Sequence, residues 1–319
     1  MCTKTRFDKE KYFLDTLKGL GVFKGVGDDC VNLSYAANLK SLKSFQVLDY
    51  KDKVVGFDSF IEGVHFKRSF MSLKDITTKA FLVNFSDIVA CNAVPKYALL
   101  SIALPSLSKL ELKEIAEAIA KICKDYKIYL IGGDTTNAKA LSFNIVVFGI
   151  LQDERKTSKT FVKRRFLSRQ SRHLKGGLLA YTRARDRDLG TSLKTLNALL
   201  RYPKRLVHNR RDERFLSPKL RSGFVAEARK KMLIGLDISD GLASEVKYLE
   251  SSNKLGLKSL IKLNSKIWKS GEEYEMLFAY NKKDRLSLKR LAKKHRIAFK
   301  DVGSFERVSK LDIRLNVWH

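Results

Sequence analysis

Five short segments of the 319-residue sequence place aspartates beside glycine or other small residues, where turns or helix starts are expected. Carboxylate oxygens are the ligands that magnesium takes in phosphoryl-transfer sites, together with phosphate oxygens. Neighbouring glycines let backbone N–H groups approach a phosphate. The segments therefore favour metal-assisted chemistry on phosphate compounds. They are Gly27-Asp28-Asp29, Asp58 in GFDSFIEGVHF, Asp87 in VNFSD, Gly132-Gly133-Asp134-Thr135-Thr136, and Asp237-Ile238-Ser239-Asp240-Gly241.

Each segment also has a purely structural explanation. Ser239 or Asp240 could cap the helix that follows them. Gly132-Gly133-Asp134 could be a tight turn, and a lone histidine such as His65 is more often structural than ligand-binding. Asp87 falls within an apolar helical stretch, where burying an unpaired carboxylate is costly, so it needs a partner or a cation. No single segment is specific, and only their combination indicates a site.

The sequence also argues against several other classes of protein. No apolar run is long enough to cross a bilayer, and the charged N-terminus does not have the pattern of a secretory signal. The four cysteines are scattered without a CxxC pair, as expected for reduced thiols in the cytoplasm. No Ser-His-Asp or Cys-His arrangement is evident, so no covalent nucleophile is expected. We therefore predict a cytoplasmic protein with no membrane partner.

The net charge of +29 is concentrated in one part of the chain. Residues 155–231 hold 24 Lys and Arg against 5 Asp and Glu, a net of +19. A basic surface attracts nucleic acids, membranes and small anions alike, and a solvated basic surface with no dedicated partner explains it equally well. The segment has no RNA-binding motif and few interleaved aromatic residues. Nucleic-acid binding is possible but not expected.

Periodicity predicts a mixed α/β fold of the α+β type. Residues 75–93 and 110–126 have helical spacing, whereas 54–61, 97–104, 128–131 and 141–151 read as strands. These elements predict an N-terminal domain over residues 1–151.

A polar, basic stretch over residues 152–176 follows, and we place the domain boundary there. Strands are then expected at 178–181, 232–236 and 275–280, and helices at 189–200, after Gly241 and at 286–295. They predict a second α/β domain over residues 152–319.

In their order and in their residues, six stretches resemble the thiamine-monophosphate kinase family, which belongs to the superfamily of aminoimidazole ribonucleotide synthetase. Six ordered matches with similar gaps are far more specific than one phosphate-loop pattern. The stretches are GVGDDCVNL (25–33), FDSFIEGVHF (57–66), KAFLVNFSDIVACNAVPKYALLSIALP (79–105), LIGGDTT (130–136), LDISDGLASE (236–245) and SGEEYEMLF (270–278).

The resemblance implies an enzyme that transfers the γ-phosphoryl group of ATP directly to thiamine monophosphate, giving thiamine diphosphate with the help of several Mg²⁺ ions. It implies a two-domain protomer whose N-terminal mixed sheet pairs with that of a second copy to form a homodimer. By the same resemblance, the metal ligands would be Asp29, Asp58, Asp87, Asp134, Asp237 and Asp240. ATP would contact Gly133, Asp134, Arg164 and Ser239, and the thiamine substrate would contact His65 and Glu272.

The sequence departs from the family pattern in a few places. Residues 164–192 lack the usual glycine-rich turns, which weakens the match at Arg164, and Trp318 is only a possible counterpart of the family's substrate-stacking aromatic. Another ATP-using enzyme of the superfamily, of the selenophosphate synthetase type, is an alternative, although Cys2 does not have the setting of a reactive cysteine there. A catalytically retired scaffold that binds nucleic acid through residues 155–231 is a further alternative.

Overall fold

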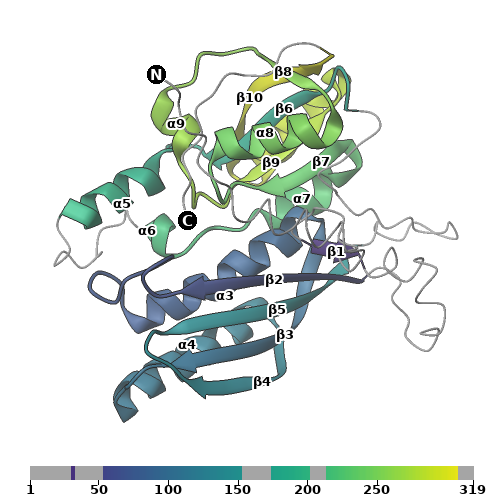
Figure 1. Cartoon of the computed structure of the whole chain (residues 1–319). Helices are drawn as coiled ribbons and strands as arrows, with labels where there is room; N and C mark the ends of the chain where they lie inside the picture. The colour runs from purple at the N-terminus through teal and green to yellow at the C-terminus, as the bar shows by residue number, and fades with distance from the viewer. Residues whose placement is uncertain (1–29, 33–52, 153–173, 202–212, 308–319) are drawn as a thin grey trace, which may run out of the picture.

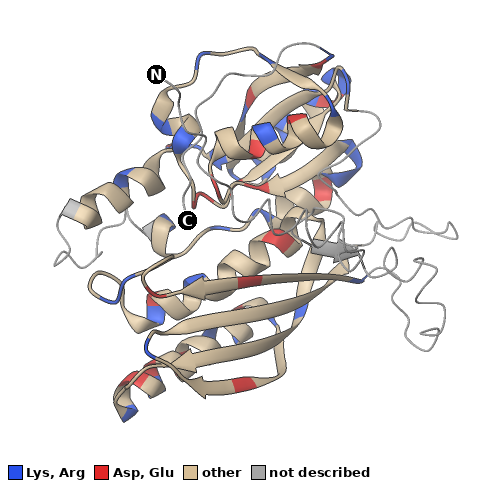
Figure 2. Ribbon diagram, in the orientation of Figure 1, with Lys and Arg blue, Asp and Glu red and all other residues tan. Residues whose placement is uncertain are grey.

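The computed structural model describes residues 30–32, 53–152, 174–201 and 213–307, and the structural statements below concern these residues (Figure 1). Two of the predicted site residues, Asp29 and Arg164, lie outside them, as do Trp318 and the 155–173 and 202–212 parts of the basic segment. Lys and Arg are spread over many elements of the described chain rather than gathered on one (Figure 2).

The first sheet has five strands and is mixed, as predicted. Its neighbouring strands are antiparallel except for the last pair, in which β4 runs parallel to β3. The order across the sheet is β1 (Cys30–Asn32), β2 (Lys53–Ile61), β5 (Ser142–Leu151), β3 (Ala93–Leu104) and β4 (Tyr129–Asn137).

Two helices cover one face of this sheet. Helix α3 (Leu73–Ala90) begins after Ser72, whose hydroxyl oxygen accepts a hydrogen bond from the Asp75 N–H, and its core-facing side chains lie against the sheet. Helix α4 (Lys109–Tyr126) begins with a capping box between Ser108 and Glu111, and it packs on α3. Helix α3 is buried on nearly all sides because the second half of the chain covers the face that the sheet leaves open.

The opposite face of the first sheet has no helix over it among the described elements. Along β5 the side chains alternate as in a half-buried strand. Phe143, Ile145 and Val147 are fully buried, whereas Phe148 is only half-buried. On β2, Phe57 is 56% exposed. Among the described residues, nothing therefore covers this apolar sheet face.

The second sheet is antiparallel throughout its described pairs. Helix α8 (Leu242–Asn253) packs into the core on one face, and α7 (Ser222–Ala228) and α10 (Arg285–Lys294) pack into the core on the other. The order of strands is β7 (Met232–Asp237), β9 (Met276–Tyr280), β6 (Leu178–Ala184), β10 (Ile297–Glu306) and β8 (Gly256–Ser259).

Shorter helices complete the described chain. They are α5 (Thr191–Arg201), α6 (Glu213–Leu216), α9 (Ser265–Lys269) and the 3-10 turns η2 (Arg229–Lys231) and η3 (Lys282–Asp284). None of the described helices has the length and apolar character needed to span a membrane.

The two sheets meet along helix α3, and we call this contact the junction. Near the C-terminus of α3, Val89 and Ala90 belong to the core of the second sheet, together with Phe224. In the other direction, Phe215 and Leu216 of α6 are buried in the core of the first sheet. Side chains on α3 are thus placed to contact loops of the second sheet.

One expected local structure is wrong. The strand predicted at residues 128–131 does not end before Gly132-Gly133-Asp134, because β4 runs on through these residues to Asn137 in parallel pairing with β3. A Cβ atom on Gly133 would lie 1.8 Å from the carbonyl oxygen of Leu100. Here the glycine allows close approach of two strands, rather than a tight turn.

Candidate functional site

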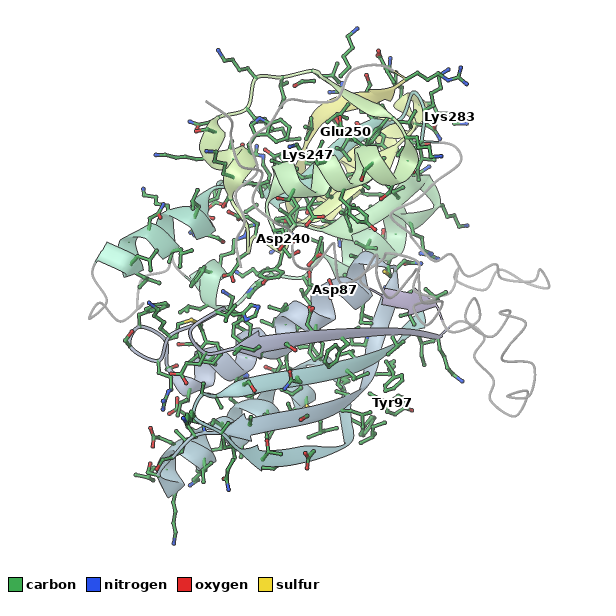
Figure 3. The ribbon with its side chains drawn as sticks, viewed as in Figure 1. Asp87, Tyr97, Asp240, Lys247, Glu250 and Lys283 are labelled. Atoms are coloured by element: carbon green, nitrogen blue, oxygen red, sulfur yellow. The ribbon has the colours of Figure 1, made fainter. Side chains whose placement is uncertain are left out.

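Three of the predicted metal ligands come from three different elements and converge at the junction. Asp58 is in β2, Asp87 is in α3 and Asp237 ends β7. Asp87 and Asp237 are 6% and 2% exposed, and Asp58 is half-buried. Figure 3 shows Asp87 on α3 at the junction, with Asp240 on the side of the second sheet.

Burial of Asp87 raises the pKa of its carboxyl group well above the usual range, and the nearby charges of Asp58 and Asp237 raise it further. A hydrogen bond with the Asp58 side chain acts in the same direction. Like-charged buried carboxylates are stable together only with a shared proton or a cation between them. The chemistry of this donor set therefore suits a divalent cation.

Polar side chains of α3 bond to two of the three aspartates. The Ser86 hydroxyl donates a 2.5 Å hydrogen bond to Oδ2 of Asp237, and the Asp58 backbone N–H donates a 3.0 Å bond to Oδ1 of Asn84. The buried side chain of Tyr274 lies close enough for Glu272 and all three aspartates to raise the pKa of its hydroxyl, after the larger effect of burial.

Within the described residues, no group of three or more His, Cys, Asp or Glu side chains is arranged so that it could hold a metal ion. Magnesium usually keeps water or phosphate oxygens in its coordination sphere and needs few protein ligands. Magnesium binding by Asp58, Asp87 and Asp237, together with a bound phosphate, therefore stays a prediction.

The loop after α9 is fixed against the Asp237-Ile238-Ser239 turn by backbone hydrogen bonds. The N–H of Glu272 donates to the Ser239 carbonyl at 2.6 Å, and the N–H of Tyr274 donates to that of Ile238 at 2.9 Å. Glu272 and Tyr274 both have positive φ, 53° and 49°, which is unusual for residues other than glycine. Such a strained loop persists only when its surroundings hold it, and functional sites often contain one.

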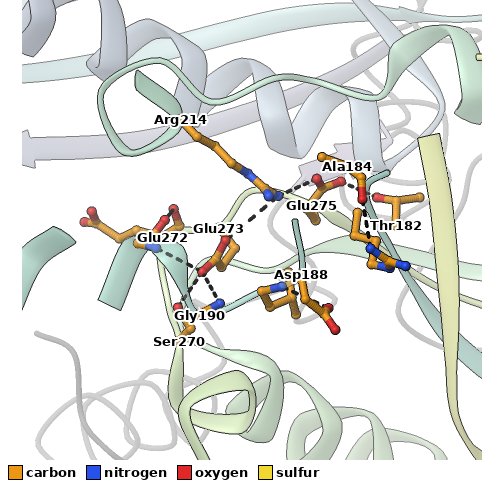
Figure 4. A network of polar contacts seen from close by, with 12 residues as sticks. Thr182, Ala184, Asp188, Gly190, Arg214, Ser270, Glu272, Glu273 and Glu275 are labelled. Atoms are coloured by element: carbon orange, nitrogen blue, oxygen red, sulfur yellow. Dashed lines mark hydrogen bonds and ion pairs between the residues drawn. The ribbon is translucent and has the colours of Figure 1, made fainter. Parts of the chain in front are cut away.

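The three glutamates of this loop each have a different set of partners, and Figure 4 shows Glu273 beside Gly190 and Ser270, with Arg214 directed at Glu275. Glu272 pairs with Lys79 of α3 at 2.6 Å. Glu273 accepts hydrogen bonds from the Ser270 hydroxyl and from the backbone N–H groups of Gly190 and Ser192. Burial raises the pKa of Glu273, and these donors, with the charge of Arg214, oppose the rise.

Glu275 is fully buried and pairs with two arginines. Arg214 donates to Oε1, and Arg221 donates through Nε to Oε2 at 2.6 Å and through a second nitrogen to Oε1. The Thr182 hydroxyl also donates to Oε2 of Glu275. Because all four residues are mostly buried, this network fixes α6 and the start of α7 against the second sheet at the junction.

The space at the junction is small. A pocket with a free volume of about 10 Å³, close to that of one water, is lined by Ser86, Arg221, Asp237 and Tyr274 together with apolar side chains. This pocket is too small for a nucleotide.

The other predicted site residues lie in three places. His65 follows β2, and its Nδ1 accepts a 3.0 Å hydrogen bond from the Ile61 N–H, which leaves Nε2 to carry the proton of the neutral ring. Ser239 donates a long hydrogen bond of 3.4 Å to Glu245, and Asp240 is exposed beside it.

Gly133 and Asp134 are exposed on β4, which is separated from β2 and Asp58 by two strands of the sheet. The described structure does not bring Asp134 to the three aspartates of the junction. Its role as a metal ligand stays a prediction.

Sequence reasoning missed several residues of the junction, above all Lys79, Ser86 and Tyr274. One signal was available, since α3 carries Lys79, Asn84 and Ser86 within an otherwise apolar stretch. Polar side chains that are buried in a helix need partners. The partners themselves are 151 and 193 residues away in the sequence and could not be read from it.

The chain is similar to known proteins over most of its length. Residues 27–151 match the family model described as AIR synthase related protein, N-terminal domain. The chain is 28% identical over 312 residues to the thiamine-monophosphate kinase of Buchnera aphidicola from Acyrthosiphon pisum, covering 92% of this chain and 88% of that protein. It is 27% identical to the Bacillus subtilis thiamine-monophosphate kinase, covering 70% and 71% of the two chains.

A solved structure of AaThiL complexed with AMPPCP and TMP has the same fold. Its TM-score is 0.74 at 21% identity, over 98% of this chain and 99% of that one. Residues 27–151 thus match the model of AIR synthase related N-terminal domains, and most of the chain is similar in sequence to thiamine-monophosphate kinases.

Proposed function

We propose that the protein phosphorylates thiamine monophosphate to thiamine diphosphate, with ATP as the phosphoryl donor. The observation that carries this proposal is the convergence of Asp58, Asp87 and Asp237, from three elements, at a mostly buried junction. Their mutual repulsion is relieved by a divalent cation, and phosphoryl transfer between two anions requires one. The curated relatives with this activity cover most of the chain.

In the proposed reaction, a terminal phosphate oxygen of thiamine monophosphate forms a bond to the γ-phosphorus of ATP. The bond from that phosphorus to the β–γ bridging oxygen breaks, so the products are thiamine diphosphate and ADP. Bound magnesium would neutralise phosphate charge and hold the reacting oxygens in line. No covalent intermediate with the protein is required.

Asp58, Asp87 and Asp237 are the residues that would hold magnesium at the junction. Asp29, Asp134 and Asp240 remain predicted ligands from the resemblance, as Gly133, Arg164 and Ser239 remain predicted ATP contacts. His65 and Glu272 are the proposed substrate contacts. The position of this pair supports the proposal. Glu272 pairs with the buried Lys79 of α3, and His65 lies beside Phe60, whose ring is near the same lysine.

We further propose that the working form is a homodimer in the cytoplasm. The open face of the first sheet supports the dimer, since it exposes Phe57 and leaves Phe148 half-buried in a single chain. A contiguous exposed apolar face usually marks a protein interface. A second copy that presents the same face would cover it symmetrically.

The direct test incubates the chain with ATP, magnesium and thiamine monophosphate and measures ADP and thiamine diphosphate. Equal amounts of the two products are expected, with none when magnesium is chelated. Parallel reactions with selenide as the acceptor test the alternative within the superfamily. Turnover with selenide and none with thiamine monophosphate would replace the proposed substrate.

A further inference from the structure

Lys79 is a fully buried lysine on α3, which is an unusual place for an ammonium group. Its Nζ lies 2.6 Å from Oε2 of Glu272 and 3.6 Å from the ring centroid of Phe215. Burial lowers the pKa of Lys79, and the charge and hydrogen bond of Glu272 oppose this effect. A buried charge is retained at such cost only where it is paired, as it is here.

The position of Lys79 relates it to both proposed substrate contacts. Its Nζ is 6.0 Å from the ring centroid of Phe60, and the Phe60 ring is 5.4 Å from the ring of His65. Lys79 therefore contacts Glu272 directly, and the Phe60 ring lies near both Lys79 and His65. Lys79 is thus an ion-pair partner of one expected thiamine contact and is connected to the other through Phe60.

Glu272 is fixed at nearly every polar atom. Its N–H donates to the Ser239 carbonyl, its own carbonyl accepts from the Ser192 hydroxyl at 2.9 Å, and Oε2 accepts from Lys79. Within the described residues, Oε1 makes no hydrogen bond that would compete with a ligand. The tethers together hold the carboxylate in one direction and leave one oxygen for another partner.

We propose that Lys79 is a positioning residue for the organic part of the substrate. It acts through Glu272, whose carboxylate it holds in one orientation, so that Oε1 can accept a hydrogen bond from an amino group such as that of the thiamine aminopyrimidine ring. Phe215 covers the ammonium group and keeps water from competing for it. The inference rests on the proposed function and adds that the buried Lys79 affects the affinity for thiamine monophosphate without contacting it.

The test compares Lys79→Met, Lys79→Arg and a matched lysine control, Lys121→Met, whose side chain is exposed on α4 and pairs with Asp125. Lys79→Met is expected to raise KM for thiamine monophosphate about tenfold, or about 1.4 kcal/mol, while KM for ATP changes less than twofold. Lys79→Arg should recover part of the affinity, and Lys121→Met should behave as wild type. A folded Lys79→Met chain with unchanged KM for thiamine monophosphate would overturn the inference.

Loss of Lys79 leaves a buried glutamate unpaired, and the single variant could fail to fold. The double variant Lys79→Met/Glu272→Gln removes both charges and provides a second measurement. If Lys79 acts through Glu272, the double variant should bind thiamine monophosphate no more weakly than Glu272→Gln alone. Strictly additive losses would show that Lys79 does not act through Glu272.

Calorimetric binding of thiamine monophosphate without ATP separates this inference from the proposed reaction. A wild-type chain that binds thiamine monophosphate but transfers no phosphate would contradict the kinase, and the same variants would still test Lys79 through Kd. Wild-type turnover with variants of unchanged KM and Kd would overturn the inference alone. A folded wild-type chain that binds no thiamine monophosphate would overturn both.

Discussion

The hydroxyl of Ser86 donates a 2.5 Å hydrogen bond to the buried carboxylate of Asp237 and so connects helix α3 to the end of strand β7. Lys79 lies seven residues earlier and on the same side of α3, where it pairs with Glu272. The Ser86–Asp237 and Lys79–Glu272 contacts are two helical turns apart on α3. They connect this helix to the end of β7 and to the loop after α9, both of which carry proposed site residues. Relative movement of the two sheets would change both contacts together.

Replacing Ser86 with alanine removes the donor and leaves the Asp237 carboxylate buried beside α3. We expect Ser86→Ala to lower the free energy of unfolding by about 1–3 kcal/mol, because a buried charged acceptor loses its partner. Urea denaturation measures the change. Ser251→Ala, which removes a hydroxyl from the exposed end of α8, is the control and should cost much less. Equal effects would contradict the proposed importance of the Ser86 bond.

Asp87→Asn should stabilise the metal-free protein and abolish its activity. The substitution removes a buried negative charge beside Asp58 and Asp237, and we expect a gain of about 1–3 kcal/mol in the free energy of unfolding at pH 8. Magnesium and ATP should raise the melting temperature of wild type but not of the variant. Thermal denaturation with and without the ligands measures both effects. An active variant, or one less stable without metal, would oppose the assignment of Asp87 as a metal ligand.

Arg214→Met is expected to destabilise the protein by about 3–5 kcal/mol, because it removes one of two arginines that compensate the buried charge of Glu275. The matched control is Lys294→Met, at a pair with Glu227 in which the lysine side chain is 62% exposed. That variant should change stability by no more than about 0.5 kcal/mol. Comparable urea midpoints for the two variants would mean that the fold does not need Arg214 to compensate the buried charge of Glu275.

Asp188 provides a prediction for the pH dependence of stability. Burial alone would raise its pKa, but hydrogen bonds from Tyr181, Lys300 and the Leu189 N–H outweigh burial and lower the pKa. Because the pKa is lower in the folded state, the stabilisation is present above the unfolded value of about 3.9 and is lost as the pH falls through the folded value.

Asp188→Asn should therefore cost about 1 kcal/mol or more at pH 7 and less at pH 3, as urea denaturation at the two pH values would measure. The control Asp186→Asn changes a side chain that is 72% exposed and should show little effect at either pH. A cost for Asp188→Asn that is equal at both pH values would refute the role of its charge.

The open sheet face predicts a dimer that a single charge can disrupt. Phe57→Lys places an ammonium group on this face and should convert the protein to a monomer, because burying an unpaired charge in an interface is costly. Leu110→Lys is a matched control at a side chain that is 79% exposed at the start of α4. Sedimentation velocity should give a dimer for the control and wild type. Identical masses for all three chains would exclude this interface.

The regular elements were largely predictable because their apolar spacing is strong. Helix α4 occupies 109–126 against an expected 110–126, and β5 occupies 142–151 against 141–151. Strand β10 was missed, since Lys300, Asp301 and Gly303 interrupt its apolar pattern and resemble a turn. Asp301 in fact pairs with Arg285, and Gly303 allows close approach of Leu257.

The site was predictable only in part, because some of its residues depend on contacts between distant parts of the chain. Short motifs identified the aspartates, because each motif is local in the sequence and resembles a known family. They did not identify Lys79 or Ser86, whose partners depend on how the two sheets meet. The Gly132-Gly133-Asp134 motif was placed in a turn because glycine pairs usually mark one, whereas here they permit close strand pairing.

The central claim is that the buried aspartates at the junction support phosphoryl transfer to thiamine monophosphate. The most direct measurement is the rate of thiamine diphosphate formation from ATP and thiamine monophosphate, with wild type, Asp237→Asn and the exposed control Asp125→Asn assayed side by side. The account predicts turnover by wild type and the control, and a loss of at least about a hundredfold in Asp237→Asn, as for other groups that stabilise transition-state charge. A folded wild-type protein without turnover, or an Asp237→Asn variant with wild-type turnover, would contradict it.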